Sequence, residues 1–252
     1  MKKRLIIGNW KMYVETPEVA VSLVKDLKSK MRSLSYVDVA LAPSFVLLPT
    51  VADILSRSTI KVGAQAVSSN HAPAHTGEVS AKMLKNVGAT FAIIGHSERR
   101  ALGETNEVVR AQILEATSMG LGVVLCVGEK ERDLGGEHFA FIKEQLTSAL
   151  TNFPAKSVSK LVVAYEPVWA IGKSASDAMK PQDVHETTIF IRKTLTGLLE
   201  PTAAKKVTII YGGSVEAENA PALITEGGVG GFLVGHASSS IETFLPILKA
   251  CK

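Results

Sequence analysis

The sequence predicts an α/β protein that forms one closed (β/α)8 barrel over residues 1–252. Eight short apolar runs alternate with amphipathic stretches, and 252 residues divided among eight units give about 31 residues for each strand and helix. No linker, shift in composition or low-complexity segment divides the chain. Hydrophobic residues make up 46% and charged residues 21%, which is typical of globular proteins and excludes intrinsic disorder.

The eight apolar runs are four to six residues long, rich in β-branched residues and Leu, and do not alternate strictly with polar residues. Strands of a parallel sheet that are buried on both faces have this pattern. Runs this short do not exclude helix by periodicity, so their Gly, Pro and polar flanks decide. In chain order, the expected strands are residues 5–8, 37–42, 60–64, 91–94, 123–127, 161–165, 207–211 and 231–234.

Five stretches between these runs carry apolar residues at helical spacing. The first follows Pro17, which suits a first helical turn, and places Val19, Leu23 and Leu27 four residues apart. A short helix is also expected to open at His96. The five expected helices are residues 18–31, 107–117, 138–150, 183–199 and 241–248.

An open, doubly wound sheet is the alternative architecture. Such a sheet normally carries a G-x-G-x-x-G turn after its first strand, where a nucleotide phosphate binds. Here the first run is followed by Asn9, Trp10 and Lys11, without that turn. The closed barrel is therefore favoured.

The chain is mildly basic, which is compatible with an anionic substrate. Lys and Arg number 28 against 24 Asp and Glu, which gives a net charge of +4. The charges are scattered, and the densest cluster, Lys2-Lys3-Arg4, is short. A nucleic-acid surface needs a basic stripe or patch, so no nucleic-acid partner is expected.

The two cysteines, Cys126 and Cys251, form no C-x-x-C pair, which argues against a disulfide framework and a structural zinc site. No cluster of His, Asp and Glu with metal-ligand spacing occurs either, so no metal is expected. The first apolar run is too short for a signal peptide, and no run reaches the roughly 18 residues of a membrane span. A cytoplasmic location without membrane contact is expected.

Polar residues with catalytic chemistry follow the expected strands. In a (β/α)8 barrel, the reactive groups lie at the carboxyl ends of the strands, on one face. That rule brings together a cation, an imidazole, carboxylates and two glycine-rich turns. The residues are Asn9, Lys11, Gln65, His96, Glu98, Glu166, Gly212, Gly213, Ser214, Gly235 and His236.

Each of the three ionisable candidates has two interpretations. Glu166 follows an apolar run directly and is either a general base or half of an interior salt bridge. His96 either caps a helix or is a neutral hydrogen-bond donor, because a helix N-terminus disfavours imidazolium. Lys11 is either a Schiff-base amine or a fixed positive charge, and a nearby Glu98 would favour the second role.

The glycine-rich turns after the last two strands allow backbone N–H groups to approach a phosphate, helped by helix N-termini that follow. They are also compatible with plain tight turns. The segment 169–180, between Glu166 and the next helix, is either a lid that excludes water or a long connection.

Five motifs, in order along the whole chain, resemble triosephosphate isomerase. They are Gly8-Asn9-Trp10-Lys11-Met12, Gly95-His96-Ser97-Glu98-Arg99-Arg100, the segment Ala164-Tyr165-Glu166-Pro167-Val168-Trp169-Ala170-Ile171-Gly172, Tyr211-Gly212-Gly213-Ser214-Val215 and Gly231-Phe232-Leu233-Val234-Gly235. The resemblance implies the TIM barrel of that family, a homodimer, and an isomerase of glycolysis and gluconeogenesis that needs no cofactor. Its substrates would be dihydroxyacetone phosphate and D-glyceraldehyde 3-phosphate.

The resemblance also implies the role of each site residue. Glu166 would move the proton between two substrate carbons, and His96 would be the neutral electrophile at the carbonyl, a pairing that is a known property of this family. Lys11, positioned by Glu98, would stabilise the enediolate and the phosphate, and Asn9 would hydrogen-bond the substrate oxygen. The backbone around four residues would hold the phosphate: Gly172, Ser214, Leu233 and Gly235.

The chain departs from the family pattern at four places. The lid reads Lys173 to Pro181 in place of the usual Thr-Gly-Lys, with about two additional residues. His236 replaces the second Gly of the family's Val-Gly-Gly turn, so its ring either points away or adds a charged hydrogen bond to the phosphate. Gly230 stands where an Asp is usual, and the interdigitating loop has Pro73 and His75 in place of Gly and Phe.

Two other functions remain as alternatives. A Schiff-base aldolase on the same fold would use Lys11 as its amine. The second alternative is a non-enzymatic barrel that acts as a binding or surface-adhesion protein. It would not explain why Glu166, His96 and Lys11 all follow strands at the same end of the barrel. The isomerase is the function we expect.

Overall fold

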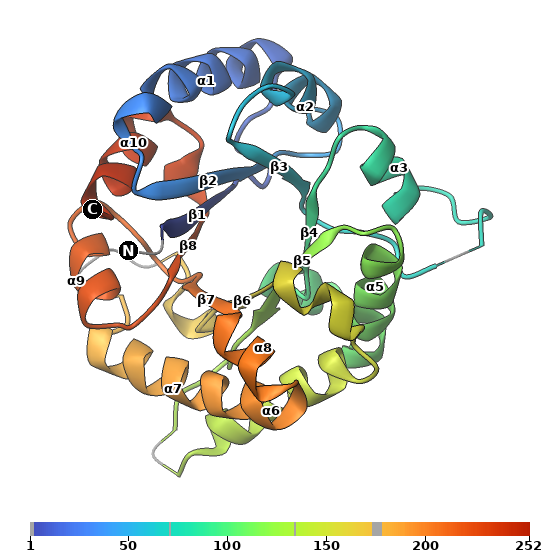
Figure 1. Cartoon of the computed structure of the whole chain (residues 1–252), viewed down its shortest axis with the longest axis vertical. Helices are drawn as coiled ribbons and strands as arrows, with labels where there is room; N and C mark the ends of the chain where they lie inside the picture. The colour runs from blue at the N-terminus through green and yellow to red at the C-terminus, as the bar shows by residue number, and fades with distance from the viewer. Residues whose placement is uncertain (1–2, 71, 134, 173–177) are drawn as a thin grey trace.

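Eight parallel strands close into a barrel, in the order β1 to β8, in a computed structural model that describes residues 3–70, 72–133, 135–172 and 178–252 (Figure 1). The last strand pairs with the first, so the open-sheet alternative is wrong. The strands are β1 (Arg4–Asn9), β2 (Val37–Ala42), β3 (Lys61–Ala64), β4 (Phe91–Ile94), β5 (Gly122–Val127), β6 (Leu161–Tyr165), β7 (Thr208–Tyr211) and β8 (Gly231–Val234).

Helices surround the barrel. The α-helices are α1 (Pro17–Lys30), α2 (Leu48–Leu55), α3 (Ala81–Asn86), α4 (Ser97–Ala101), α5 (Asn106–Ser118), α6 (Glu137–Leu150), α7 (Pro181–Leu198), α8 (Pro201–Lys206), α9 (Ala220–Thr225) and α10 (Ile241–Ala250). Short 3-10 turns are η1 (Met31–Ser33), η2 (Ala155–Lys160), η3 (Val168–Ala170) and η5 (His236–Ser238). The (β/α)8 prediction is confirmed, strand by strand, with ends that differ by one residue at most.

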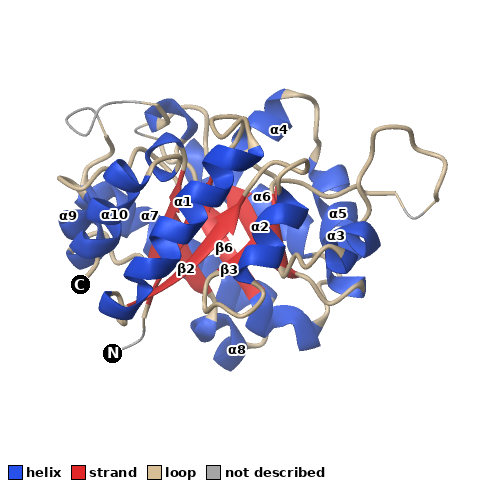
Figure 2. Cartoon of the chain, turned by 90° about the horizontal axis from the view of Figure 1, so that it is seen from above, coloured by secondary structure: helices blue, strands red, loops and turns tan. Residues whose placement is uncertain are grey.

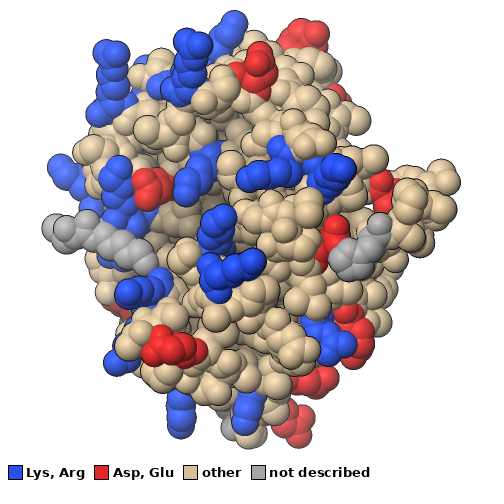
Figure 3. Space-filling view, turned by 45° about the vertical axis from the view of Figure 1, so that its right-hand side comes forward, with Lys and Arg blue, Asp and Glu red and all other residues tan. Residues whose placement is uncertain are grey.

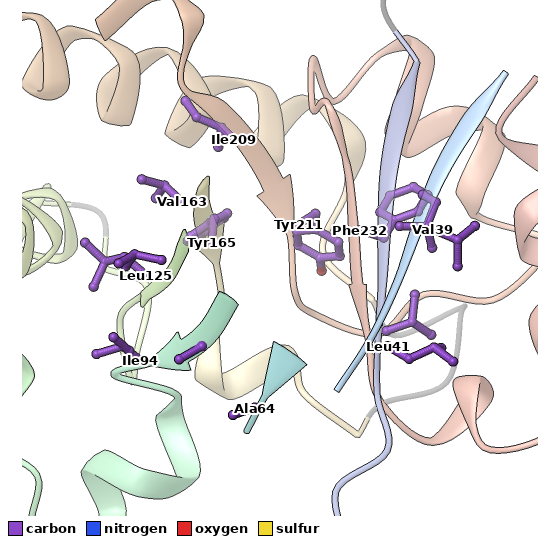
Figure 4. Close-up of a cluster of buried hydrophobic side chains, with 14 of the residues drawn as sticks. Val39, Leu41, Ala64, Ile94, Leu125, Val163, Tyr165, Ile209, Tyr211 and Phe232 are labelled. Carbon is purple, nitrogen blue, oxygen red and sulfur yellow. The ribbon is translucent and has the colours of Figure 1, made fainter. Parts of the chain in front are cut away.

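Side chains alternate between two apolar layers along each strand. Inner positions, such as Ile7, Ala164 and Ile210, form one cluster inside the barrel. Outer positions pack beneath the helices, and Figure 4 shows part of this cluster, which includes Leu125, Tyr165 and Phe232. The strand sequences do not alternate between apolar and polar residues because both faces of the sheet are buried.

The two ends of the barrel carry different elements. The N terminus and α8 lie at one end, and α4 lies at the other, where the carboxyl ends of the strands lead into the following loops (Figure 2). Among the described residues, no helix is both long enough and apolar enough to span a bilayer.

Candidate active site

Strand alternation directs two of the expected site residues into the barrel mouth. Asn9 stands two residues after Ile7, and Glu166 stands two residues after Ala164, so both continue the inner face. The side chains are almost fully buried, with Asn9 5% and Glu166 2% exposed. A carboxylate at such a position must be held by hydrogen-bond donors, since an unpaired buried charge is costly.

Two donors hold the Glu166 carboxylate. The backbone N–H of Ser97 donates to Oε2 at 3.1 Å, and Nε2 of His96 lies 3.3 Å from Oε1. Gly212 makes room for this side chain, because a Cβ there would lie 2.8 Å from Cγ of Glu166. The first glycine of the Gly212-Gly213 turn thus has a packing reason besides any approach to a phosphate.

His96 caps α4 with its own ring. The backbone N–H of Glu98 donates to Nδ1 of His96 at 3.2 Å, so that nitrogen carries no proton. The ring is then the neutral tautomer with its proton on Nε2, the nitrogen that faces Glu166. The sequence leaves two alternatives for His96, a helix cap or a neutral hydrogen-bond donor. In the structure, the single hydrogen bond from the Glu98 N–H to Nδ1 gives the ring both properties.

Lys11 adopts a left-handed backbone conformation, with φ of 47°, that places its side chain over the mouth. Its N–H donates to Oδ1 of Asn9 at 3.2 Å, and its carbonyl accepts from Nε2 of Gln65 at 3.0 Å. The ammonium lies 2.6 Å from Oε1 of Glu98. This ion pair favours a protonated Lys11, which is a fixed charge and a poor Schiff-base nucleophile.

These groups line one cavity of about 410 Å³ at the carboxyl ends of the strands. Of the site residues expected from the sequence, all but Gln65 and Glu98 line it. Those two residues contact Lys11, which does line the cavity. The lining includes Asn9, Lys11, His96, Glu166, Gly172, Ser214, Leu233, Gly235 and His236. A space of this size suits a small phosphorylated molecule.

The turns after β7 and β8 form one side of this cavity. Gly235 is the N-cap of η5, and Gly235, His236 and Ala237 all line the cavity, so the start of this short turn lies beside it. The His236 ring packs edge-on against Tyr13, with ring centroids 4.7 Å apart. Tyr13 also lines the cavity and was not identified from the sequence.

A buried carboxylate anchors the segment that leads into the expected lid. Glu129, 1% exposed, accepts from Tyr165 Oη at 2.9 Å and from Trp169 Nε1 at 2.8 Å through its Oε1. Burial and the Glu129 charge raise the pKa of Tyr165 well above its usual range, so the phenol stays a donor. Residues 173–177 of the expected lid lie outside the described residues.

Sequence reasoning missed partners that act through the backbone or lie far along the chain. Gln65 was placed at a strand end without a role, and the Ser97 N–H and Glu129 were not identified. Glu129 left one usable signal, a carboxylate just beyond the apolar run of β5. A backbone N–H donor such as that of Ser97 cannot be recognised from the sequence, because nearly every residue type carries one.

Comparisons with known proteins agree with this geometry. A family model described as triosephosphate isomerase matches residues 4–251. The triosephosphate isomerase of Carboxydothermus hydrogenoformans is 42% identical over 252 residues and covers 99% of both chains. That of Treponema denticola is also 42% identical, with 98% of both covered. The solved structure of triosephosphate isomerase from Bartonella henselae is similar with a TM-score of 0.87, at 31% identity and 98% coverage of both chains.

Proposed function

Given that the chain belongs to the triosephosphate isomerase family, we propose how its own residues interconvert dihydroxyacetone phosphate and D-glyceraldehyde 3-phosphate. The reaction is the aldose–ketose isomerisation of glycolysis and gluconeogenesis. It moves a proton between two adjacent carbons, and a second proton between the oxygens bonded to those carbons, through an enediolate. The observation that carries the assignment is the convergence of Glu166, His96 and Lys11 on one cavity.

Glu166 takes the proton from one substrate carbon and returns it to the next. To do so, its carboxylate leaves the Ser97 N–H, which holds it when no substrate is present. His96 donates its Nε2 proton toward the substrate carbonyl oxygen as negative charge develops there. The Lys11 ammonium, held by Glu98 at 2.6 Å, offsets the charge of the enediolate.

The remaining lining residues orient the substrate. Asn9 hydrogen-bonds a substrate oxygen beside Lys11. The backbone at Gly172, Ser214, Leu233 and Gly235 binds the phosphate, and His236 stands at the edge of that region. Binding at a fixed site keeps the reactive carbons near Glu166, which lowers the entropic part of the barrier.

Replacing the base tests this assignment. Glu166→Gln keeps the side chain's shape and removes its ability to accept a proton, so turnover in a coupled isomerase assay should fall by roughly 10²–10⁴-fold. The circular dichroism spectrum should match that of the parent. Activity within about threefold of the parent would refute the role of Glu166, since base catalysis contributes far more than that.

The aldolase alternative has its own readout. A Schiff base on Lys11 would become a permanent adduct when borohydride is added with substrate. The Lys11–Glu98 ion pair predicts no such adduct. A mass increase at Lys11 would favour the aldolase.

We further propose a single catalytic domain over residues 1–252, a cytoplasmic location and a homodimer. The dimer proposal is supported by exposed apolar side chains in the loops after β1 to β4, on one side of the barrel. Met12 is 85%, Val46 82% and Leu102 77% exposed. Contiguous exposed apolar groups mark interfaces.

A further inference from the structure

A second cavity, of about 530 Å³, opens at the amino-terminal end of the barrel, opposite the catalytic mouth. Residues from the beginnings of the strands line it, which places it on the barrel axis. Leu5, Phe91 and Val162 are among these residues. Since the catalytic residues lie at the strands' carboxyl ends, the two cavities are separated by the inner apolar layer.

The floor of this cavity is apolar and reaches solvent. Leu5 and Val162 pack against the inner cluster but are only partly buried, so the apolar interior of the barrel meets water here. Ile7, Ala40 and Val124 continue the floor inward. An exposed concave apolar surface favours a ligand with an apolar body, because its burial removes that surface from water.

Four lysines form the rim: Lys61, Lys85, Lys160 and Lys206. Lys61 stands two residues before Gly63 in β3, so strand alternation directs its side chain toward the barrel axis. Lys160 ends η2, directly before the first residue of β6. Lys160 Nζ donates to the carbonyl of Gly120 at 2.9 Å, which holds this ammonium beside the opening. Figure 3 shows Lys and Arg side chains gathered around a hollow on this part of the surface.

Negative charge is scarce at this rim. None of the described residues that line the cavity is Asp or Glu. Asp38, which pairs in register with Leu5 at the same end, lies 3.6 Å from Lys3. Like charges gathered around an opening repel one another and create a positive potential, which an anion offsets.

We propose that the amino-terminal mouth of the barrel binds an organic anion with an apolar body, of the class of medium-chain carboxylates and aryl sulfonates. The anionic group contacts Lys61, Lys85 and Lys160, and the apolar part lies on Leu5, Phe91 and Val162. A cavity of about 530 Å³ falls in the size range of small-molecule sites. Because the catalytic cavity is at the other end, the anion and the triose phosphate bind without competing.

A fluorescence titration with 8-anilinonaphthalene-1-sulfonate tests the proposal on the full chain. Lys61→Gln and Lys160→Gln should each raise the Kd of the probe by about two- to fivefold, which is the effect of losing one exposed charge pair. The variant that carries both substitutions should raise it further. Lys193→Gln, which removes the same charge from α7, is the matched control and should leave the Kd unchanged. These lysines are exposed, so the variants should fold.

Competitors identify the chemistry. Octanoate should displace the probe at least about tenfold better than butanoate, because each buried methylene adds affinity. Saturating inorganic phosphate should not displace it, since phosphate occupies the catalytic end. Equal Kd values for the rim variants and Lys193→Gln would overturn the proposal, as would displacement by phosphate. Displacement by polyglutamate but not by octanoate would overturn it in favour of an acidic polypeptide.

Discussion

His96 illustrates how one hydrogen bond sets the chemistry of a residue. The Glu98 N–H donates to Nδ1, which fixes the neutral tautomer with its proton on Nε2. The ¹⁵N signals of the ring should therefore show Nε2 protonated and Nδ1 unprotonated near neutral pH. His138 is an internal control, because its Nδ1 lies 2.9 Å from the Asp133 carboxylate and must be the protonated nitrogen. Two protonated nitrogens on His96 would contradict the neutral-electrophile role.

His236 gives a second prediction at the scale of one residue. Its contact with Tyr13 holds the ring at the edge of the catalytic cavity, beside Gly235. An imidazole N–H there would donate a hydrogen bond to a bound phosphate. His236→Gly should therefore raise the inhibition constant of inorganic phosphate by about two- to fivefold, a surface-pair magnitude.

Comparing variant and parent at the same pH cancels the protonation of phosphate itself. Tyr13→Phe is the control, since it keeps an aromatic ring against His236. Equal inhibition constants for His236→Gly and the parent would show that the ring takes no part in binding.

Residue identity predicted which side chains meet in the candidate active site, but not the groups that hold them there. Asn9, His96 and Glu166 were predictable because polar groups directly after buried strands must meet at one face of a barrel. The Ser97 donor was not, because every residue type except proline carries an N–H. The left-handed φ of Lys11 could not be predicted either, because non-glycine residues seldom adopt this conformation. It is also supported by a hydrogen bond from Gln65, which lies 54 positions away in the sequence.

At the scale of elements, the beginning of α6 depends on a residue outside the helix. Its N-cap, Gly136, has no side chain to accept a hydrogen bond. Asp133 supplies the acceptor for the N–H groups of Glu137 and His138, at 3.0 and 2.8 Å. These bonds, first of all the one from the His138 N–H, hold the pKa of Asp133 well below its usual range.

The lowered pKa makes the contribution of Asp133 dependent on pH. A carboxyl group whose pKa is depressed in the folded state stabilises that state above its unfolded pKa, and loses this effect as the pH falls. Asp133→Ala should therefore lower Tm by about 2–4 °C at pH 7, with a difference that narrows below about pH 4. Asp26→Ala, an exposed change on α1, is the control for scanning calorimetry. A difference that is independent of pH would contradict the cap.

The elements that sequence reasoning missed are the short ones. Helices α2, α3, α8 and α9 have six to eight residues, which is too few for an amphipathic repeat to stand out. The expected helix after Gly213 begins only at Ala220, and the turn after β8 is η5. The strands were predictable because a strand that is buried on both faces has a continuous apolar sequence, and this does not depend on which helices cover it.

For the whole molecule, the exposed apolar loops predict association. Light scattering should give a mass of about twice 26.8 kDa if the loops after β1 to β4 meet a second copy. Val46→Lys should shift the mass toward one chain, because it places a charge in the apolar contact. Ile189→Lys, an exposed apolar position on α7, should not. A parent that elutes at the mass of one chain would contradict the dimer.

The pairing of β1 with β8 has a consequence for the order in which activity arises during synthesis. Asn9 and Lys11 follow the first strand to be made, and Leu233 and Gly235 belong to or follow the last. A nascent chain with seven strands therefore holds His96 and Glu166 but lacks one wall of the substrate cavity. Because a domain generally folds as a unit, we expect catalysis to begin in a single step, when β8 pairs with β1.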